Sequence, residues 1–171
     1  TDHIDTIDTV LAGLLPRHVA QMQGWTGALW CGAVVTDDGH ASLRLYLNQR
    51  WGTLAERIAR LATAIGTVAG TDAMRRWHSA STHLGEHLMP YGVALDVGAR
   101  GVARIKIYTA SHDASLGIVM PYLLAALPQA DGSSAHALLH DCEALGGWMR
   151  PWQVMPCLEF ARAGPVRAKV D

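Results

Sequence analysis

Short runs rich in residues that favour β-strands occur in three pairs along the chain, and turn residues separate the members of each pair. The runs GALWCGAVVT and ASLRLYLN, for example, flank the sequence DDGH at residues 37–40. Two such runs joined by an Asp-Gly turn are typical of a β-hairpin. The pattern therefore predicts three hairpins, near residues 27–48, 91–110 and 152–171.

The segments between the hairpins place apolar residues three and four positions apart, which is the spacing of an amphipathic helix. We expect helices at about residues 3–22, 54–65, 71–87, 115–127 and 134–145. Thr53 and Glu56 stand three residues apart at the start of the second of these, which predicts a capping box there. Gly66 and Gly70 are expected to end it, while Pro16 and Pro121 interrupt the first and fourth.

The predicted order is helix, hairpin, two helices, hairpin, two helices, hairpin. The second strands carry Tyr46, Tyr108 and Lys169, which are 62 and 61 residues apart, so the chain contains an internal repeat. Hairpins separated by helix pairs favour an α+β fold, in which helices cover the outer face of an antiparallel sheet. A single ferredoxin-like unit is the alternative architecture, but it does not explain a threefold repeat. We expect one domain over residues 1–171.

The composition narrows the class of protein. The chain has 171 residues, of which 50% are hydrophobic and 17% are charged, an ordinary balance for a globular domain. A formal net charge of −1 offers no broad attraction for nucleic acid or an acidic membrane. No run reaches the ~18–20 apolar residues of a membrane span. The opening TDHIDTIDTV lacks the basic and apolar regions of a signal peptide, so we expect a cytoplasmic protein.

The cysteines and histidines do not indicate a metal centre. Cys31, Cys142 and Cys157 are odd in number and show no C-x-x-C spacing, so we expect them to be reduced. His136 and His140 stand in the sequence HALLH, which lacks the glutamate of the zinc motif HExxH. We therefore expect neither a metal nor a cofactor.

The second strand of each predicted hairpin has one apolar and one cationic face, because side chains alternate along a strand. The polar positions are Arg44 and Tyr46, then Arg104, Lys106 and Tyr108, then Arg167 and Lys169. On a sheet that faces water, these residues are ordinary surface. If the sheet curls into a barrel, they point inward and require an anion, and Arg and Lys suit a phosphate or diphosphate.

Tyrosine rings beside these cations would attract a carbocation through the negative faces of the rings. An anionic diphosphate together with a carbocation is the chemistry of allylic diphosphates. The adjacent pair Asp37 and Asp38 lies in a tight turn and forms no aspartate-rich magnesium motif. Neutralisation of the diphosphate would therefore fall to Arg and Lys alone. Either Trp30 or Cys31 could line such a chamber, and strand parity does not decide between them.

Several segments resemble the bacterial indole prenyltransferases of the dimethylallyl-tryptophan synthase family. RLYLNQRWG at residues 44–52 is similar to their K-V-Y-L-N-P-x-x-G stretch. LDVGARGVARIKIYTASHDAS at 95–115 is similar to their L-D-L…R-V-K-V-Y segment, and residues 141–171 resemble the hairpin that follows. The similarity extends over about residues 25–171.

The resemblance implies an ABBA-type fold, an antiparallel β-barrel of repeated α-β-β-α units with the helices outside. It implies metal-independent transfer of a dimethylallyl group from its diphosphate to tryptophan or another indole. Residues that match the family's diphosphate-binding positions are Arg44, Arg104, Lys106 and Lys169. Tyr46 and Tyr108 match the tyrosines that shield the allylic cation.

The chain also departs from the family. The family barrel has five hairpins, against three here, and none of Glu56, Glu86, Glu143 and Glu159 stands where the family places the glutamate that handles the indole N–H. The chain is then a fragment of a longer protein, or it pairs with a copy of itself or with a second chain to complete the barrel. One alternative is a non-catalytic relative that binds an anion or serves as a partner subunit. Another is an unrelated α+β interaction domain with its cations scattered in solvent.

Overall fold

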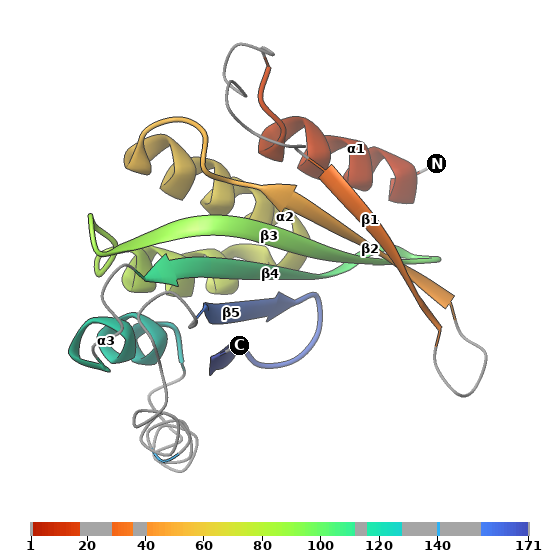
Figure 1. The fold of residues 1–171 in the computed structure, drawn as a ribbon. Coiled ribbons are helices and arrows are strands. Elements are labelled where there is room, and N and C mark those ends of the chain that lie inside the picture. The colour runs from red at the N-terminus through yellow and green to blue at the C-terminus, as the bar shows by residue number, and fades with distance from the viewer. Residues whose placement is uncertain are drawn as a thin grey trace.

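A six-stranded antiparallel sheet forms the centre of the molecule, and its strands follow one another in chain order (Figure 1). The computed structural model describes residues 2–17, 29–35, 41–111, 116–127, 140 and 155–170. The strands are β1 (Leu29–Val35), β2 (Ala41–Asn48), β3 (Leu88–Gly98), β4 (Gly101–Ser111), β5 (Pro156–Ala161) and β6 (Arg167–Val170). Strands β1 and β6 lie at the two edges, and within the described residues the sheet is open rather than closed into a barrel.

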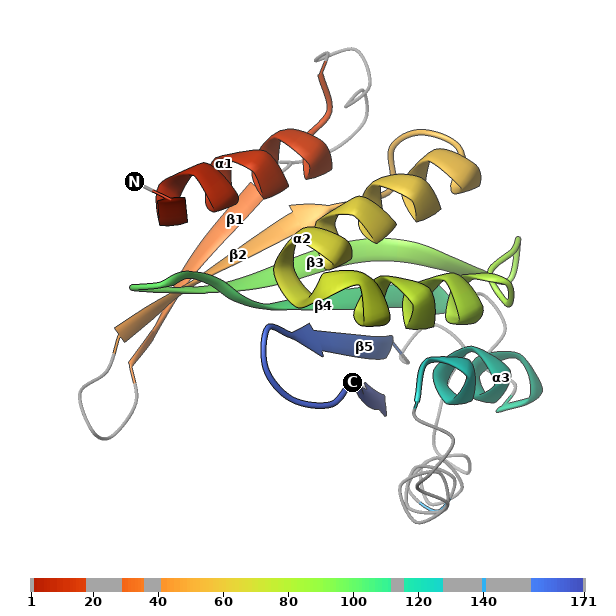
Figure 2. The same cartoon turned by 180° about the vertical axis from the view of Figure 1, so that it is seen from behind.

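The described helices all lie on one face of this sheet, as the front and back views show (Figures 1 and 2). They are α1 (Asp2–Leu14), α2 (Leu54–Ser81) and α3 (Leu116–Ala126). The α+β class and the placement of helices on the outer face, which the repeat predicted, are confirmed. Among these helices, none combines the length and the apolar character that crossing a bilayer requires.

The two helices predicted at 54–65 and 71–87 both lie within α2, where the non-helical backbone of Gly70 separates them, and the second ends at Ser81. The capping box at the start of α2 is formed, because the Thr53 side chain accepts a hydrogen bond from the Glu56 backbone and Glu56 bonds back to Thr53. The helix then continues through Gly66 and bends at Gly70, whose φ of +87° only glycine adopts at low cost. Across the bend, Trp77 Nε1 donates to the carbonyl of Ile58 at 3.0 Å. The break predicted at Gly70 is therefore confirmed, whereas Gly66 lies inside the first helix.

The core lies between the helices and the outer face of the sheet. Apolar residues alternate along the strands and are buried there, namely Leu45, Leu47, Val93, Leu95, Ile105, Ile107, Leu158 and Phe160. The helices contribute Leu14, Ile65, Trp77 and Leu123, each of them fully buried. Burial of each such side chain stabilises the fold by about 1.5–3 kcal/mol. One face of the sheet is therefore buried against the helices, and only the opposite face can contact a ligand.

The structure also bears on the predictions for the remaining helices, the cysteines and the metal ligands. The first helix ends at Leu14, ahead of Pro16, and α3 accommodates Pro121 within it. The predicted helix at 134–145 lies outside the described residues apart from His140, and Cys142 lies outside them too. Neither Cys31 nor Cys157 forms a disulfide; Cys31 is exposed and Cys157 is buried. Within the described part of the chain, no group of three His, Cys, Asp or Glu side chains comes together to hold a metal ion.

Candidate functional site: the open face of the sheet

The face of the sheet turned away from the helices, here called the open face, carries the cationic and tyrosine positions predicted from the sequence. Strand pairing aligns these positions in three rows across the sheet. The first row runs Arg44–Asp96–Arg104, the second Tyr46–Ala94–Lys106–Glu159–Arg167, and the third Asn48–Gly92–Tyr108–Cys157–Lys169. Side chains directly opposite on neighbouring strands are close enough to interact. These rows extend over β2 to β6. Trp30 of β1 pairs with Tyr46 and extends the same surface to the sixth strand.

The first row is an ion-pair network centred on Asp96. The carboxylate accepts a hydrogen bond from Arg44 Nε at 2.6 Å and another from Arg104 Nε at 2.6 Å. It also accepts a hydrogen bond from Arg104 Nη2. One buried acid on β3 therefore holds two guanidinium groups from the strands on either side of it, and charge-assisted bonds of this kind are strong.

Glu159 extends the network toward the second row. Its Oε1 accepts a hydrogen bond from Arg104 Nη1 at 3.0 Å, and its Oε2 lies 3.9 Å from Lys106 Nζ. Both Lys106 and Glu159 are 8% exposed. Buried charges are stable only when they are paired, so Glu159 and Lys106 support one another in this position.

The protonation behaviour of the first row follows from these bonds. The hydrogen bond to Asp96, and next the one involving Tyr46, raises the pKa of Arg44 above its ordinary value. Burial alone would raise the pKa of Asp96, but the hydrogen bonds from Arg44 and Arg104 outweigh it and lower that pKa. For Arg104, burial lowers the pKa, and its bonds to Asp96 and Glu159 reverse the direction. These shifts favour the charged forms of Arg44, Asp96 and Arg104.

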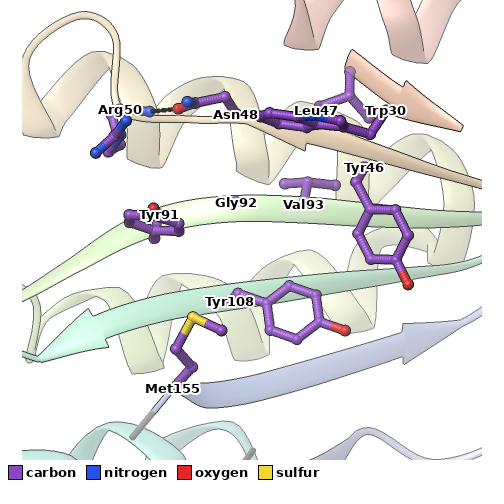
Figure 3. Close-up of a pocket in the computed structure, with 10 residues that line it drawn as sticks. All are labelled: Trp30, Tyr46, Leu47, Asn48, Arg50, Tyr91, Gly92, Val93, Tyr108 and Met155. Carbon is purple, nitrogen blue, oxygen red and sulfur yellow. Dashed lines mark hydrogen bonds between the residues drawn. The ribbon is translucent and has the colours of Figure 1, made fainter. Parts of the chain in front are cut away.

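The open face contains two neighbouring pockets. One, the ionic pocket, has a volume of about 480 Å³, and its charged lining residues are Arg44, Asp96, Arg104, Glu159 and Arg167. The other, the aromatic pocket, has a volume of about 570 Å³ and is lined by the side chains drawn in Figure 3, among them Trp30, Tyr46, Tyr91, Tyr108 and Met155. Strand β4 links the two pockets, because Lys106 stands between Arg104 of the first and Tyr108 of the second.

Gly92 on β3 leaves space in the aromatic pocket, and the next residue on the same face, Ala94, is also small. Gly92 lies between Asn48 and Tyr108, and Ala94 lies between Tyr46 and Lys106. A larger side chain at either position would project between the neighbouring side chains, since all of them share one face. Strand β3 therefore places the carboxylate of Asp96 in the ionic pocket and leaves room for a ligand in the aromatic pocket.

Arg50 is the one charged residue among the described residues that line the aromatic pocket. Its guanidinium carbon lies 5.0 Å from the centre of the Tyr91 ring, and its backbone N–H donates to Asn48 Oδ1 at 2.9 Å (Figure 3). A positive group over an aromatic face is a favourable pairing. The aromatic pocket thus has a cationic rim.

A buried anchor fixes the segment that carries Arg50. Gln49 is fully buried and donates from Nε2 to the carbonyl of Leu14 at 3.1 Å. Arg60 of α2 donates to Gln49 Oε1 at 2.9 Å and to the carbonyl of Trp51 at 2.6 Å, and its guanidinium carbon lies 3.6 Å from the Trp51 ring centre. Burial, and next the charge of Arg57, lowers the pKa of Arg60 to about 10.

The structure places the predicted site residues as follows. Arg44, Arg104 and Lys106 share the open face with Tyr46 and Tyr108, and Lys169 is half-buried on the same face, beside Cys157. Trp30 lines the aromatic pocket, which decides between Trp30 and Cys31.

Sequence reasoning missed four residues of the open face: Arg50, Tyr91, Asp96 and Glu159. Asp96 and Glu159 could have been found from strand pairing, because each stands directly opposite a predicted cation. Arg50 follows the end of β2, and Tyr91 lies at a register shift in β3, so simple alternation does not place either of them.

The chain forms an antiparallel sheet in chain order, with helices on one face and cationic and aromatic residues on the other, and this fold resembles part of the ABBA prenyltransferase fold. The chain is similar to the crystal structure of 6-dimethylallyltryptophan synthase from Micromonospora olivasterospora in complex with DMASPP and Trp. The TM-score is 0.71 at 19% identity, over 97% of this chain and 47% of that one. A second structure, a 6-dimethylallyl tryptophan synthase, has a TM-score of 0.67 at 18% identity, over 94% and 44%.

These comparisons confirm the resemblance inferred from the sequence, at the level of the fold. The chain spans less than half the length of the solved chains that it matches. No protein-family model and no curated protein matches its sequence.

Proposed function

We propose that this chain carries part of the active site of a metal-independent aromatic prenyltransferase. The enzyme would transfer a dimethylallyl group from its diphosphate to tryptophan or another indole. One observation carries the proposal: Arg44, Arg104 and Lys106 share a face with Tyr46 and Tyr108, so that the ionic pocket adjoins the aromatic one. An allylic diphosphate needs these two environments side by side.

In the proposed reaction the bond between the allylic carbon and the diphosphate oxygen breaks, and its electron pair leaves with the diphosphate. An electron pair of the indole ring then forms the new bond to the allylic carbon. Loss of a proton from the alkylated ring restores its aromaticity. The protein would lower the barrier mainly by preorganised charges at the two places where charge develops.

The cationic residues would bind the leaving group. Arg44 and Arg104 are held in place through Asp96, so their charges are oriented before the substrate arrives. Lys106 is buried between the pockets, where an ammonium group would meet the phosphoryl oxygens nearest the breaking bond. Lys169 lies one strand beyond Cys157 and would extend the same cationic surface.

The tyrosines would shield the allylic cation. The rings of Tyr46 and Tyr108 both line the aromatic pocket, from β2 and β4 (Figure 3). The negative faces of such rings stabilise a nearby carbocation, and they exclude the water that would otherwise trap it. The remaining aromatic lining, with Trp30 and Tyr91, suits the indole ring.

Completion of the chamber belongs to the same proposal. Among the described residues, β1 and β6 each pair with one neighbouring strand only, and native proteins avoid leaving the backbone donors and acceptors of such edges exposed. We propose that further strands close the sheet into a barrel and that they come from a longer polypeptide, a second copy or a second chain. The mass of the purified chain in solution tests this, since a monomer excludes closure by a second copy.

The diphosphate site is tested by calorimetric titration of dimethylallyl thiolodiphosphate in EDTA. We expect wild-type protein to bind without metal, and Arg104→Ala or Lys106→Ala to abolish binding while the fold persists. Arg75→Ala is the matched control, because Arg75 pairs with Asp72 on the exposed surface of α2. Unchanged binding in both site variants would contradict the assignment.

A second candidate function is a non-catalytic relative that binds an anionic ligand or acts as a partner subunit. The chain spans less than half the length of each solved structure that it matches, so the activity of those proteins does not transfer to it from the fold alone. Incubation with dimethylallyl diphosphate and tryptophan separates the two. Binding without a prenylated product supports the second function, and a prenylated product supports the first.

A further inference from the structure

Glu159 occupies the middle of the cationic surface. In the strand register it lies between Lys106 of β4 and Arg167 of β6, all three on the open face. Its two oxygens engage separate cations, Arg104 at 3.0 Å and Lys106 at 3.9 Å. The side chain is 11% exposed, on the wall of the ionic pocket. A negative charge therefore already stands where the cations would receive an anionic ligand.

The charge of Arg104 is shared between two carboxylates before any ligand arrives. Its Nε and Nη2 donate to Asp96, and its Nη1 donates to Glu159. An incoming diphosphate must therefore compete for the charge of this guanidinium with anions that the protein itself supplies. Like charges placed close together in a shielded site repel strongly, so the ligand and Glu159 cannot both keep the same partners at full strength.

The two carboxylates are held to different degrees. Asp96 accepts bonds of 2.6 Å from two arginines on neighbouring strands. Glu159 has one hydrogen bond of 3.0 Å and one longer ion pair, on a side chain with an additional rotatable bond. The less tightly bound group is the one that a ligand displaces first.

We propose that Glu159 is an internal counter-ion that sets the affinity of the ionic pocket, and that a bound diphosphate takes over its contacts with Arg104 and Lys106. Asp96, by contrast, keeps Arg44 and Arg104 oriented in both states. Glu159 thereby stabilises the empty site and weakens retention of free diphosphate after transfer. The inference rests on the diphosphate site proposed above.

Titration of inorganic pyrophosphate into wild-type protein and into Glu159→Gln tests this directly. Glutamine has the same shape and still accepts a hydrogen bond from Arg104, although Lys106 loses its ion pair at 3.9 Å, and a denaturation curve of the variant checks that the fold is retained. We expect Glu159→Gln to bind pyrophosphate about tenfold more tightly or better, since one like charge is removed from a shielded site. Damage to the pocket would change affinity in the opposite direction, which makes the sign of the effect diagnostic.

Two further variants separate charge from shape. Glu159→Asp keeps the charge on a shorter side chain, and its affinity for pyrophosphate should stay within about threefold of wild type, well short of the change expected for the glutamine variant. Asp72→Asn removes a carboxylate from an exposed ion pair on α2, and it should leave the affinity unchanged.

The outcomes distinguish this inference from the function on which it rests. If wild type binds pyrophosphate and Glu159→Gln binds it equally or more weakly, the counter-ion role is wrong and the diphosphate site stands. If neither protein binds pyrophosphate, the diphosphate site is wrong and the counter-ion role falls with it. Binding by Glu159→Gln, where wild type binds far more weakly or not at all, supports both.

Discussion

The two faces of the sheet differ in the kind of side chain that they carry. The outer face buries an unbroken apolar layer under the helices, with Ile105, Ile107 and Phe160 fully inaccessible to solvent. The open face, one residue away along each strand, holds buried charges such as Lys106 and Asp96 that stay in place only because they are paired. Stability is thus concentrated on one face and ligand recognition on the other. Substitutions on the two faces should consequently affect different measurements.

The largest loss of stability is expected from the outer face. Trp77→Ala removes a fully buried indole and its hydrogen bond to Ile58 across the bend of α2. The free energy of unfolding should fall by about 3–5 kcal/mol, measured by chemical denaturation. A loss below about 1 kcal/mol would mean that the bend does not depend on this residue.

A smaller loss of stability is expected from the open face, and its size tests how far stability is confined to the outer face. Asp96→Ala leaves Arg44 and Arg104 without their shared carboxylate. We expect a loss of about 1–3 kcal/mol in the free energy of unfolding, since a part-buried charge loses its partner. If Asp96→Ala unfolds like wild type, the network is not a structural element.

Acidification tests the same network. The pKa of Asp96 in the folded state is lowered, because the hydrogen bonds from Arg44 and Arg104 outweigh the opposing effect of burial. Its contribution to stability is therefore present above the pKa of the unfolded chain, about 3.9, and is lost as the pH falls through the lower folded value. Denaturation curves between pH 7 and pH 2 should show a smaller acid loss for Asp96→Asn than for wild type.

A larger side chain in the aromatic pocket should lower the affinity of that pocket for its ligand and leave the affinity of the ionic pocket unchanged. Gly92 has ordinary backbone angles and only the carbonyl of Leu47 within 4 Å of a Cβ atom placed there, at 3.5 Å. Gly92→Leu should fill the pocket and lower the affinity for an indole at least about tenfold. Pyrophosphate affinity should remain that of wild type, and calorimetry with each ligand in turn measures both. Equal losses for both ligands would mean that the pockets are not independent.

The smallest effect is expected away from both faces. Thr53→Ala removes the cap of α2 and should cost about 1 kcal/mol in the free energy of unfolding, with ligand binding unchanged. This variant is the reference against which changes on the open face are judged.

Local signals in the sequence predicted local structure well. Thr53 and Glu56 formed the expected capping box, because such a motif depends only on residues three positions apart. The alternation Arg104, Lys106, Tyr108 placed those residues on one face, as the period of a strand requires. Gly70 separates two helices, as the sequence predicted, but the sequence did not show that Gly66 stays helical or that Trp77 contacts Ile58, because that contact links residues far apart in the sequence.

The sequence by itself determined which face of each strand is apolar and which is cationic, because side-chain alternation is a property of the backbone. Only the tertiary structure decided which strands adjoin, and hence that Asp96 stands between Arg44 and Arg104 and Glu159 opposite Lys106. The sequence suggested a row of unmatched cations, whereas the folded sheet supplies two of their counter-ions. The physical reason is register: the pairing of strands places charges distant in sequence opposite each other, and burial then requires them to pair.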